Sequence, residues 1–175
     1  MNILITGSPG VGKTTLIKRV LKELRCDAGG FYTEEMREGG IRKGFKIITL
    51  DGKEGVLAHV GIKSLFRVSK YGVDVNEFER VGVSALEDAI RGGKVIVIDE
   101  IGKMELFSQR FKGAVKAALD APSLVLATMG KISSPWVREI KGREDVCLLE
   151  VTFKNRVSMV AEITDLILSQ GESDA

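Results

Sequence analysis

The feature that most constrains this chain is an apolar segment, a glycine-rich turn and an amphipathic segment that follow one another without a gap near its start. Residues 2–6 are short, mostly branched and apolar, and they end at a glycine, which is typical of a buried parallel strand. Residues 13–25 carry apolar side chains three and four positions apart, which predicts a helix with one buried face. A strand that leads through a tight turn into a helix begins a parallel βαβ unit, so we expect an α/β fold.

The rest of the chain repeats this pattern with one exception. Three more apolar runs predict buried strands and three amphipathic segments predict helices; the strands are 94–99, 123–129 and 146–151, and the helices are 77–91, 108–120 and 155–169, with Asn76 and Ser108 as N-caps. Residues 30–60 differ, because glycines separate apolar runs around an Asp51-Gly52 turn, which predicts antiparallel hairpins. We therefore expect one α/β domain over residues 1–175, with a mainly parallel central sheet and a small antiparallel β insertion near 30–60.

The turn between the first strand and the first helix has the spacing G-x-x-x-x-G-K-[ST] of a phosphate-binding P-loop. Glycines let consecutive backbone N–H groups point toward phosphate oxygens, and the start of the helix adds its positive end. Lys13 supplies a full charge to the β- and γ-phosphates, and Thr14 offers a hydroxyl to Mg²⁺. The loop therefore predicts binding of a nucleoside triphosphate with Mg²⁺ through Gly7, Ser8, Pro9, Gly10, Val11, Gly12, Lys13, Thr14 and Thr15.

A second motif follows the predicted strand 94–99. The strand delivers Asp99 and Glu100 to its carboxyl end, where ligand sites of α/β sheets lie. We predict that Asp99 joins Thr14 in holding Mg²⁺, directly or through water. Glu100 is the predicted base that orients and deprotonates the attacking water, which makes it a catalytic residue beside Lys13. The predicted nucleotide-contacting segment is Val95, Ile96, Val97, Ile98, Asp99, Glu100, Ile101 and Gly102.

Residues 99–102 also match D-x-x-G, the motif whose glycine N–H senses the γ-phosphate in GTPases. The N-K-x-D motif that selects guanine is absent from the sequence. A dedicated GTPase switch is therefore disfavoured.

Composition excludes several other classes of function. Hydrophobic residues make up 44% and charged residues 29%, which predicts a folded chain, and the net charge of +2 gives no overall attraction to nucleic acid or membranes. One histidine and two cysteines without metal-ligand spacing exclude a zinc site. The first residues lack the basic region of a signal peptide, and no stretch reaches the length of a membrane helix. We expect a cytoplasmic protein with no membrane association.

Four stretches resemble a known family. GSPGVGKTT, GGFYTEEMREGGIRKGFKIITLDG, VIVIDEIGKMELFS and LLEVTFKNR are similar to the small P-loop nucleoside-triphosphatase family described in thermophiles, which includes the cancer-related nucleoside triphosphatase of animals. This resemblance spans nearly the whole chain. It implies a three-layer, RecA-like or AAA-like core in which another strand lies between the P-loop strand and the Asp99 strand. It also implies slow, weakly base-selective hydrolysis of ATP, GTP and other triphosphates to the diphosphate and phosphate.

Hydrolysis needs a cation near the charge that develops on the γ-phosphate. Lys103 directly follows the Asp99 segment, and Arg156 lies at a predicted strand-to-helix turn, so these two are the first candidates; Arg42, Arg138 and Arg143 follow. Thr128 ends a buried strand and is a candidate to hydrogen-bond the catalytic water.

Two other functions remain open from the sequence. The first is a P-loop nucleotide or small-molecule kinase, with an acceptor pocket formed by the 30–60 insertion. The second is a nucleotide-gated module that binds RNA or a partner protein through basic residues at 37–46 and 138–143. We expect a monomer or a weak oligomer.

Overall fold

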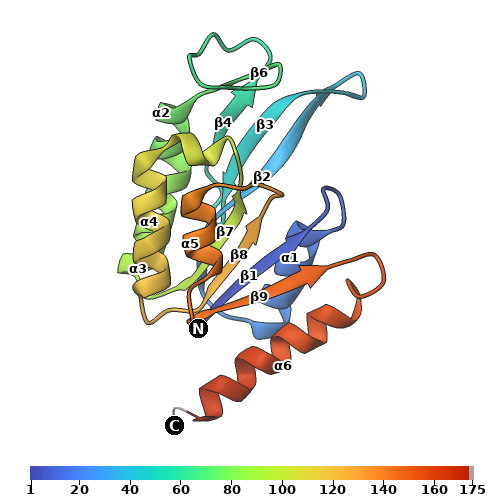
Figure 1. Cartoon of the computed structure of the whole chain (residues 1–175), viewed down its shortest axis with the longest axis vertical. Helices are drawn as coiled ribbons and strands as arrows, with labels where there is room; N and C mark the ends of the chain where they lie inside the picture. The colour runs from blue at the N-terminus through green and yellow to red at the C-terminus, as the bar shows by residue number, and fades with distance from the viewer. Residues whose placement is uncertain (174–175) are drawn as a thin grey trace.

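A computed structural model describes residues 1–173 as a nine-stranded sheet with helices on both faces (Figure 1). The strands are β1 (Asn2–Gly7), β2 (Ala28–Glu38), β3 (Ile41–Thr49), β4 (Glu54–His59), β5 (Arg67–Val68), β6 (Tyr71–Val73), β7 (Val95–Ile101), β8 (Val125–Met129) and β9 (Val146–Val151). The helices are α1 (Lys13–Leu24), α2 (Val75–Phe78), α3 (Ser84–Arg91), α4 (Gln109–Asp120), α5 (Pro135–Lys141) and α6 (Ser158–Ser173), with a π-turn η1 (Glu79–Val83) and a 3₁₀ turn η2 (Glu105–Phe107). Among the helices of residues 1–173, none is long and apolar enough to cross a membrane.

The parallel part of the sheet has the order β2-β7-β8-β1-β9. β8 therefore lies between the P-loop strand β1 and the Asp99 strand β7, as the resemblance implies. Because these strands are parallel, their carboxyl ends meet at one edge of the sheet, where the P-loop and Asp99 also lie. The arrangement confirms the predicted α/β fold with a mainly parallel central sheet.

The antiparallel region continues the same sheet and does not form a separate body. β2 is long enough to serve both halves: residues 28–31 pair in parallel with β7, and residues 31–38 pair antiparallel with β3. β4, β6 and β5 follow β3 in antiparallel order, so the region extends past the predicted boundary at residue 60 to Val73. The predicted hairpin around Asp51-Gly52 is the β3–β4 connection.

Side chains alternate between two hydrophobic cores along the parallel strands. One core contains Ile3 and Ile5 and is covered by α1 and α6. The other contains Leu4 and Ile98 and is covered by η1, α3, α4 and α5 (Figure 1). In this second core the rings of Phe31, Phe78 and Phe111 pack with centroids 5.1–6.1 Å apart. Helices on both faces complete the three layers.

The predicted helix 77–91 is present, but it starts at Val75, has a π-helical stretch in its first half, and is not capped by Asn76. The segment begins with α2, passes through the π-turn η1 and continues as α3. Its N-cap is Asp74, whose carboxylate accepts a hydrogen bond from the backbone N–H of Glu77 at 2.9 Å. In contrast, Ser108 caps α4 as predicted, accepting a hydrogen bond from the Phe111 N–H at 3.0 Å.

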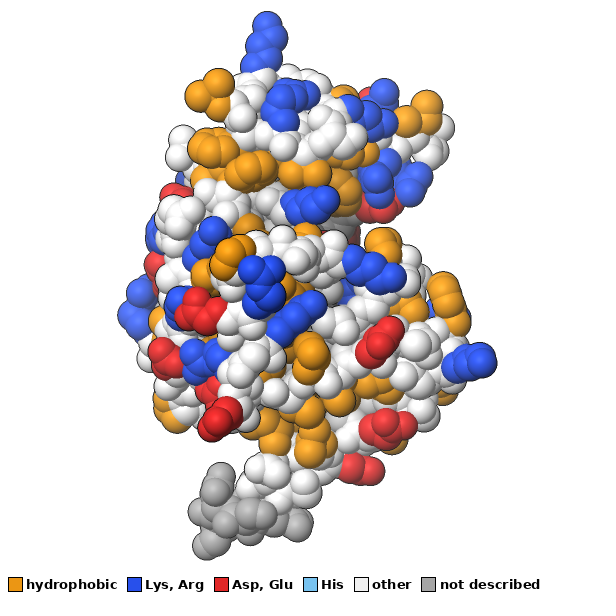
Figure 2. Space-filling model, viewed as in Figure 1, with side chains coloured by type: hydrophobic (Ala, Val, Ile, Leu, Met, Phe, Trp, Pro, Cys, Tyr) orange, Lys and Arg blue, Asp and Glu red, His pale blue; other side chains and the backbone are white. Residues whose placement is uncertain are grey.

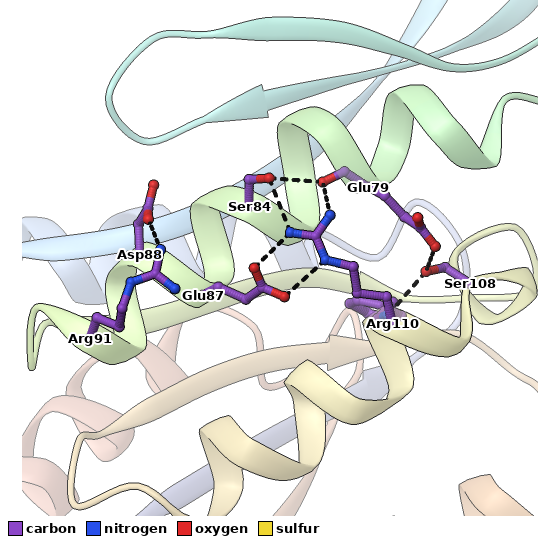
Figure 3. Close-up of polar contacts among 8 residues, drawn as sticks. Glu79, Ser84, Glu87, Asp88, Arg91, Ser108 and Arg110 are labelled. Carbon is purple, nitrogen blue, oxygen red and sulfur yellow. Dashed lines mark hydrogen bonds and ion pairs between the residues drawn. The ribbon is translucent and has the colours of Figure 1, made fainter.

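Polar contacts join α4 to the π-turn and α3 (Figure 3). Arg110 on α4 donates to both carboxylate oxygens of Glu87 on α3, at 3.0 and 2.6 Å. The Ser108 hydroxyl, which caps α4, also donates to the Glu79 carboxylate at 2.7 Å. These bonds anchor the far end of the segment that follows Asp99, since that segment ends at Ser108.

Substitution of Gly30 tests whether the close pairing of β2 with β7 stabilises the fold. It has a φ of +110°, and a Cβ there would collide with the carbonyl oxygen of Val97 on β7. We expect Gly30→Ala to lower the free energy of unfolding by at least about 3 kcal/mol, because strain and a backbone clash add. The urea midpoint measures this change.

Gly113 is the matched control. It is exposed on α4, and a Cβ there would meet nothing within 4 Å. Gly113→Ala should raise the unfolding free energy by up to about 1 kcal/mol, since alanine restricts the unfolded chain and favours helix. Equal effects of the two substitutions would contradict the assigned role of Gly30.

Candidate active site

The P-loop turns between the end of β1 and the start of α1 through three glycines with positive φ. Gly7, Gly10 and Gly12 all have positive φ values, of 154°, 76° and 106°, which L side chains rarely adopt. Lys13 begins α1 and is 9% exposed; its ammonium donates to the carbonyls of Gly7 at 2.8 Å and Ser8 at 3.4 Å. The charge of Lys13 is therefore held over the loop, where phosphate oxygens would lie.

Asp99 lies at the centre of the site. It is 3% exposed, and its two carboxylate oxygens accept hydrogen bonds from Thr14 and Thr128, each at 2.5 Å. Burial raises the pKa of Asp99, while these two hydroxyls and the charge of Lys13 act in the opposite direction. The three residues come from α1, β7 and β8, so one carboxylate connects the P-loop helix to two strand ends.

Glu100 lies beside Asp99 on the side of the site formed by β7 and β8. One carboxylate oxygen is 3.0 Å from the position a Cβ on Gly102 would take and 3.6 Å from that of Gly130. Burial raises the pKa of Glu100, the charge of Lys13 lowers it, and Asp99 raises it. The two glycines leave this carboxylate room at the wall of the cleft.

Glu105 is a site-adjacent acid that the sequence reasoning missed. It is 3% exposed, and its carboxylate lies 2.7 Å from where a Cβ on Gly102 would be. Burial, followed by the neighbouring charge of Glu100, raises the pKa of Glu105 to about 8. The sequence offered one indication of a buried acid: Glu105 stands between the apolar residues Met104 and Leu106, where an acid is unusual.

Two adjoining cavities form the cleft over the P-loop. One, of about 490 Å³, is lined by the loop, Asp99, Glu100 and residues of β2 and β3. The other, of about 530 Å³, shares Lys13, Arg42 and Glu100 with the first and continues toward Tyr71, Lys103 and Lys131. Figure 2 shows the surface hollowed between the antiparallel extension and the parallel body. The cleft is thus bounded by both halves of the sheet.

Of the predicted nucleotide-contacting segment 95–102, only the last part lines the cleft. Ile96, Val97 and Ile98 are fully buried in the sheet, and Val95 packs against a core, so their side chains position the strand and do not line the cleft. Ile101 and Val11 are also core residues. The cleft is lined by Asp99, Glu100 and Gly102 from this segment. Apolar strand residues before a site are structural because both faces of β7 are covered.

The candidate cations lie on different sides of the P-loop. Lys103 is exposed and lines the larger cavity. Arg156 lies on the opposite flank, with its Cδ 3.9 Å from where a Cβ on Gly12 would be. Arg42 lines both cavities, donating to the Tyr71 hydroxyl at 2.9 Å and to Glu35 at 3.1 Å. The structure thus places Arg42 at the phosphate cleft, although the sequence ranked it behind the other two.

Thr128 has a different contact from the one predicted. Its hydroxyl was expected to face the catalytic water, but it donates to Asp99 and is fully buried. The hydroxyl orients the Asp99 carboxylate because β8 runs directly beside β7.

Comparisons with known proteins agree with this geometry. A family model described as NTPase matches residues 2–164. Nucleoside-triphosphatase THEP1 of Thermotoga sp. (strain RQ2) is 53% identical over 98% of this chain and 99% of its own. The human cancer-related nucleoside-triphosphatase is 42% identical over 96% of this chain and 97% of its own.

Two solved structures share the fold. The crystal structure of THEP1 from Aquifex aeolicus has a TM-score of 0.85 and 41% identity, over 95% of this chain and 98% of that one. The solution structure of the human cancer-related nucleoside triphosphatase has a TM-score of 0.82 and 41% identity, over 96% and 97% of the two chains. With its P-loop, its Asp99 strand and its matching length, the chain belongs to this family of nucleoside triphosphatases.

Proposed function

We propose that this chain hydrolyses nucleoside triphosphates with Mg²⁺ to the diphosphate and phosphate, and that Glu100 activates the attacking water. The observation that carries the proposal is the convergence of Lys13, Thr14, Asp99 and Glu100 on one cleft. A loop that only binds phosphate needs the first two of these residues. The acid pair at the end of β7 supplies what hydrolysis needs in addition, a metal ligand and a base.

Lys13 and the loop amides bind the triphosphate and offset its charge. The Lys13 ammonium is already positioned by two carbonyls, so little reorganisation is needed when phosphate oxygens approach. The amides of the loop and the start of α1 add fixed dipoles. These groups stabilise the charge that moves toward the leaving diphosphate.

The donor set at Thr14 and Asp99 fits Mg²⁺. A hydroxyl and a carboxylate, 2.5 Å apart, are hard oxygen ligands, and Mg²⁺ takes one or two of these together with phosphates and water. Within residues 1–173 no group of three or more His, Cys, Asp or Glu could hold a metal ion, which suits an ion completed by its substrate. Bound there, Mg²⁺ would neutralise charge on the β- and γ-phosphates.

Glu100 is proposed as the base because of its place. It lies on the β7–β8 side of the loop, beside Gly102 and Gly130, where a water in line with the γ-phosphate has room. Both carboxylate oxygens of Asp99 already accept hydrogen bonds, one of them from Thr14, the other proposed metal ligand. Asp99 is therefore assigned to the metal and not to the attacking water. The two adjacent acids thus divide the metal-binding and proton-accepting roles.

Slow turnover and weak base selectivity extend this proposal. Arg42, which lines both cavities of the cleft, is hydrogen-bonded to Tyr71 and Glu35, outside the P-loop. If Arg42 stabilises the γ-phosphate, it must first break these hydrogen bonds, and the free energy of breaking them adds to the barrier and slows hydrolysis. We propose a monomer or weak oligomer.

Replacement of Glu100 tests the base. Glu100→Gln keeps the size of the side chain and removes the proton acceptor, so kcat should fall at least about 100-fold while KM stays near that of the wild type. Phosphate release from ATP, followed continuously, measures both constants.

Glu23→Gln is the control, because Glu23 is an exposed acid near the far end of α1. Its rate should equal that of the wild type. If Glu100→Gln kept most of the wild-type kcat, the assignment of Glu100 as base would be wrong.

Metal removal tests the role of Thr14 and Asp99. Chelation with EDTA should stop phosphate release, and added Mg²⁺ should restore it. Thr14→Ala should raise the Mg²⁺ concentration for half-maximal rate by about tenfold or more, since a lost ligand or its support weakens metal sites to that extent. Thr14→Ser retains the hydroxyl and should respond to Mg²⁺ like the wild type; an equal change in both variants would count against metal ligation.

A small-molecule kinase is the second candidate, favoured by the larger cavity. It lies next to Glu100 and is lined by Phe45, Tyr71 and the cations Arg42 and Lys103, which could hold a hydroxyl-bearing acceptor. Phosphate labelled at the γ-position separates the two functions. Transfer of label to an added nucleoside, at the expense of free phosphate, would support the kinase; release of all label as phosphate supports the hydrolase.

The basic residues at 37–46 and 138–143, the surface expected to bind RNA, have part of their charge neutralised by acidic neighbours. Arg37 and Arg42 pair with Glu35, at 2.6 and 3.1 Å, and Lys46 lies 3.5 Å from Glu54. Arg143 pairs with Asp120 and Asp145, each at 2.7 Å. Because these basic side chains already have acidic partners, the nucleotide-gated RNA module is the least favoured of the three functions.

A further inference from the structure

The turn between β9 and α6 lies directly beside the P-loop. β9 pairs in parallel with β1, with Gly7 opposite Val151, so the residues that follow each strand emerge side by side (Figure 1). The close approach of Arg156 to Gly12 confirms the proximity. Residues 152–157 therefore form the wall of the loop opposite the wall that carries Glu100.

Two exposed side chains of this turn, Phe153 and Arg156, lie against each other. Phe153 is 68% exposed, an unusual state for a phenylalanine in a folded chain. The Arg156 guanidinium lies over its ring, 5.2 Å from the centroid. Both the ring and the planar guanidinium are groups on which a nucleobase stacks.

Hydrogen bonds connect the backbone of the turn to the Asn155 side chain and to itself. The Asn155 side-chain oxygen accepts from the Thr152 N–H at 2.7 Å, and its amide donates to the Glu150 carbonyl at 2.9 Å. The Arg156 N–H donates to the Thr152 carbonyl at 3.0 Å. These bonds hold the backbone that carries Phe153 and Arg156, which limits the part of the turn that must become ordered on binding.

The sheet order determines where the nucleoside leaves the loop. Under the proposed function, on which this inference rests, the γ-phosphate faces Asp99 and Glu100, at the ends of β7 and next to β8. The α-phosphate and the nucleoside then extend to the other flank. In the order β7-β8-β1-β9, that flank belongs to the turn after β9.

We propose that Phe153 and Arg156 form the platform on which the nucleobase of the bound triphosphate stacks. Stacking does not distinguish strongly among bases, because every base has a π-face. The one amide side chain in residues 152–157, that of Asn155, is already bonded within the turn. The platform thus binds nucleosides as a class and gives a physical reason for weak base selectivity.

Inorganic tripolyphosphate tests the platform because it has the phosphates without a base. For Phe153→Ala, KM for ATP and for CTP should rise about 5- to 100-fold, the range that one stacking ring provides, with kcat unchanged. The inhibition constant of Mg²⁺-tripolyphosphate should stay at the wild-type value. Phe153→Trp should restore KM.

Two outcomes would overturn the platform. An unchanged KM for both nucleotides in Phe153→Ala would remove the ring from the site. A parallel rise in KM and in the tripolyphosphate inhibition constant would show that the substitution acts by distorting the P-loop. The control is Phe66→Ala, since Phe66 is also exposed, at 44%, and packs on Phe107; its KM values should match the wild type.

Substitution of Arg156 distinguishes a stacking role from the role of γ-phosphate cation, for which the sequence made it a candidate beside Lys103. Arg156→Ala should raise KM and leave kcat unchanged if the guanidinium stacks with the base. A fall in kcat of about 1,000-fold or more, the size of effect expected for an arginine at the γ-phosphate, would overturn its place in the platform.

The test also distinguishes failure of the platform from failure of hydrolysis. If the wild-type protein released no phosphate from any triphosphate, the proposed function would fail. Calorimetric Kd values for ATP and tripolyphosphate, on wild type and Phe153→Ala, would still decide the platform by the same comparison.

Discussion

The site depends on one buried carboxylate held between two hydroxyls. Asp99 ends the apolar part of β7, and its oxygens accept from Thr14 on α1 and Thr128 on β8. A carboxylate that is 3% exposed must have such partners, since an unpaired one would cost several kcal/mol or become protonated. These bonds therefore set the distance between the P-loop helix and the strand ends, and that distance determines whether phosphate, metal and water can occupy the cleft together.

Three buried or partly buried acids lie close together beside the P-loop. Asp99, Glu100 and Glu105 lie close enough that the two neighbours raise the pKa of Glu105, after burial, which brings it to about 8. Lys13 is the cation that opposes the pKa shifts of both Asp99 and Glu100. With its pKa raised to about 8, Glu105 is mostly protonated at neutral pH and adds little negative charge beside Asp99 and Glu100. Glu105 keeps its proton in the folded protein at pH values where it loses the proton in the unfolded chain. Its contribution therefore lowers the free energy of unfolding as pH rises from about 4.5 toward 8.

The local geometry on the P-loop side of the site could be predicted from the sequence. The glycines, Lys13 and Thr14 act within one turn, and the apolar run before Asp99 marks a central strand whatever its neighbours are. Residues whose role depends on distant pairing were harder. Thr128 bonds Asp99 only because β8 lies next to β7, and Arg42 reaches the cleft only because β2 continues from the parallel half into the antiparallel half. The π-turn in 79–83 carries helical spacing, so periodicity could not separate it from α3.

Under the two proposals, the order of strands also separates the groups that cleave the triphosphate from those that bind its base. On the β7–β8 side of the P-loop lie the acids, Gly102 and Gly130, which leave room for water and metal but offer little surface to a base. On the β9 side lie Phe153 and Arg156, which offer surface but no acid near the γ-phosphate. A triphosphate is long enough to reach both. Substitutions in the turn after β9 should therefore change nucleotide affinity without moving the residues proposed to cleave the triphosphate, whereas any shift of Asp99 disturbs α1, β7 and β8 at once.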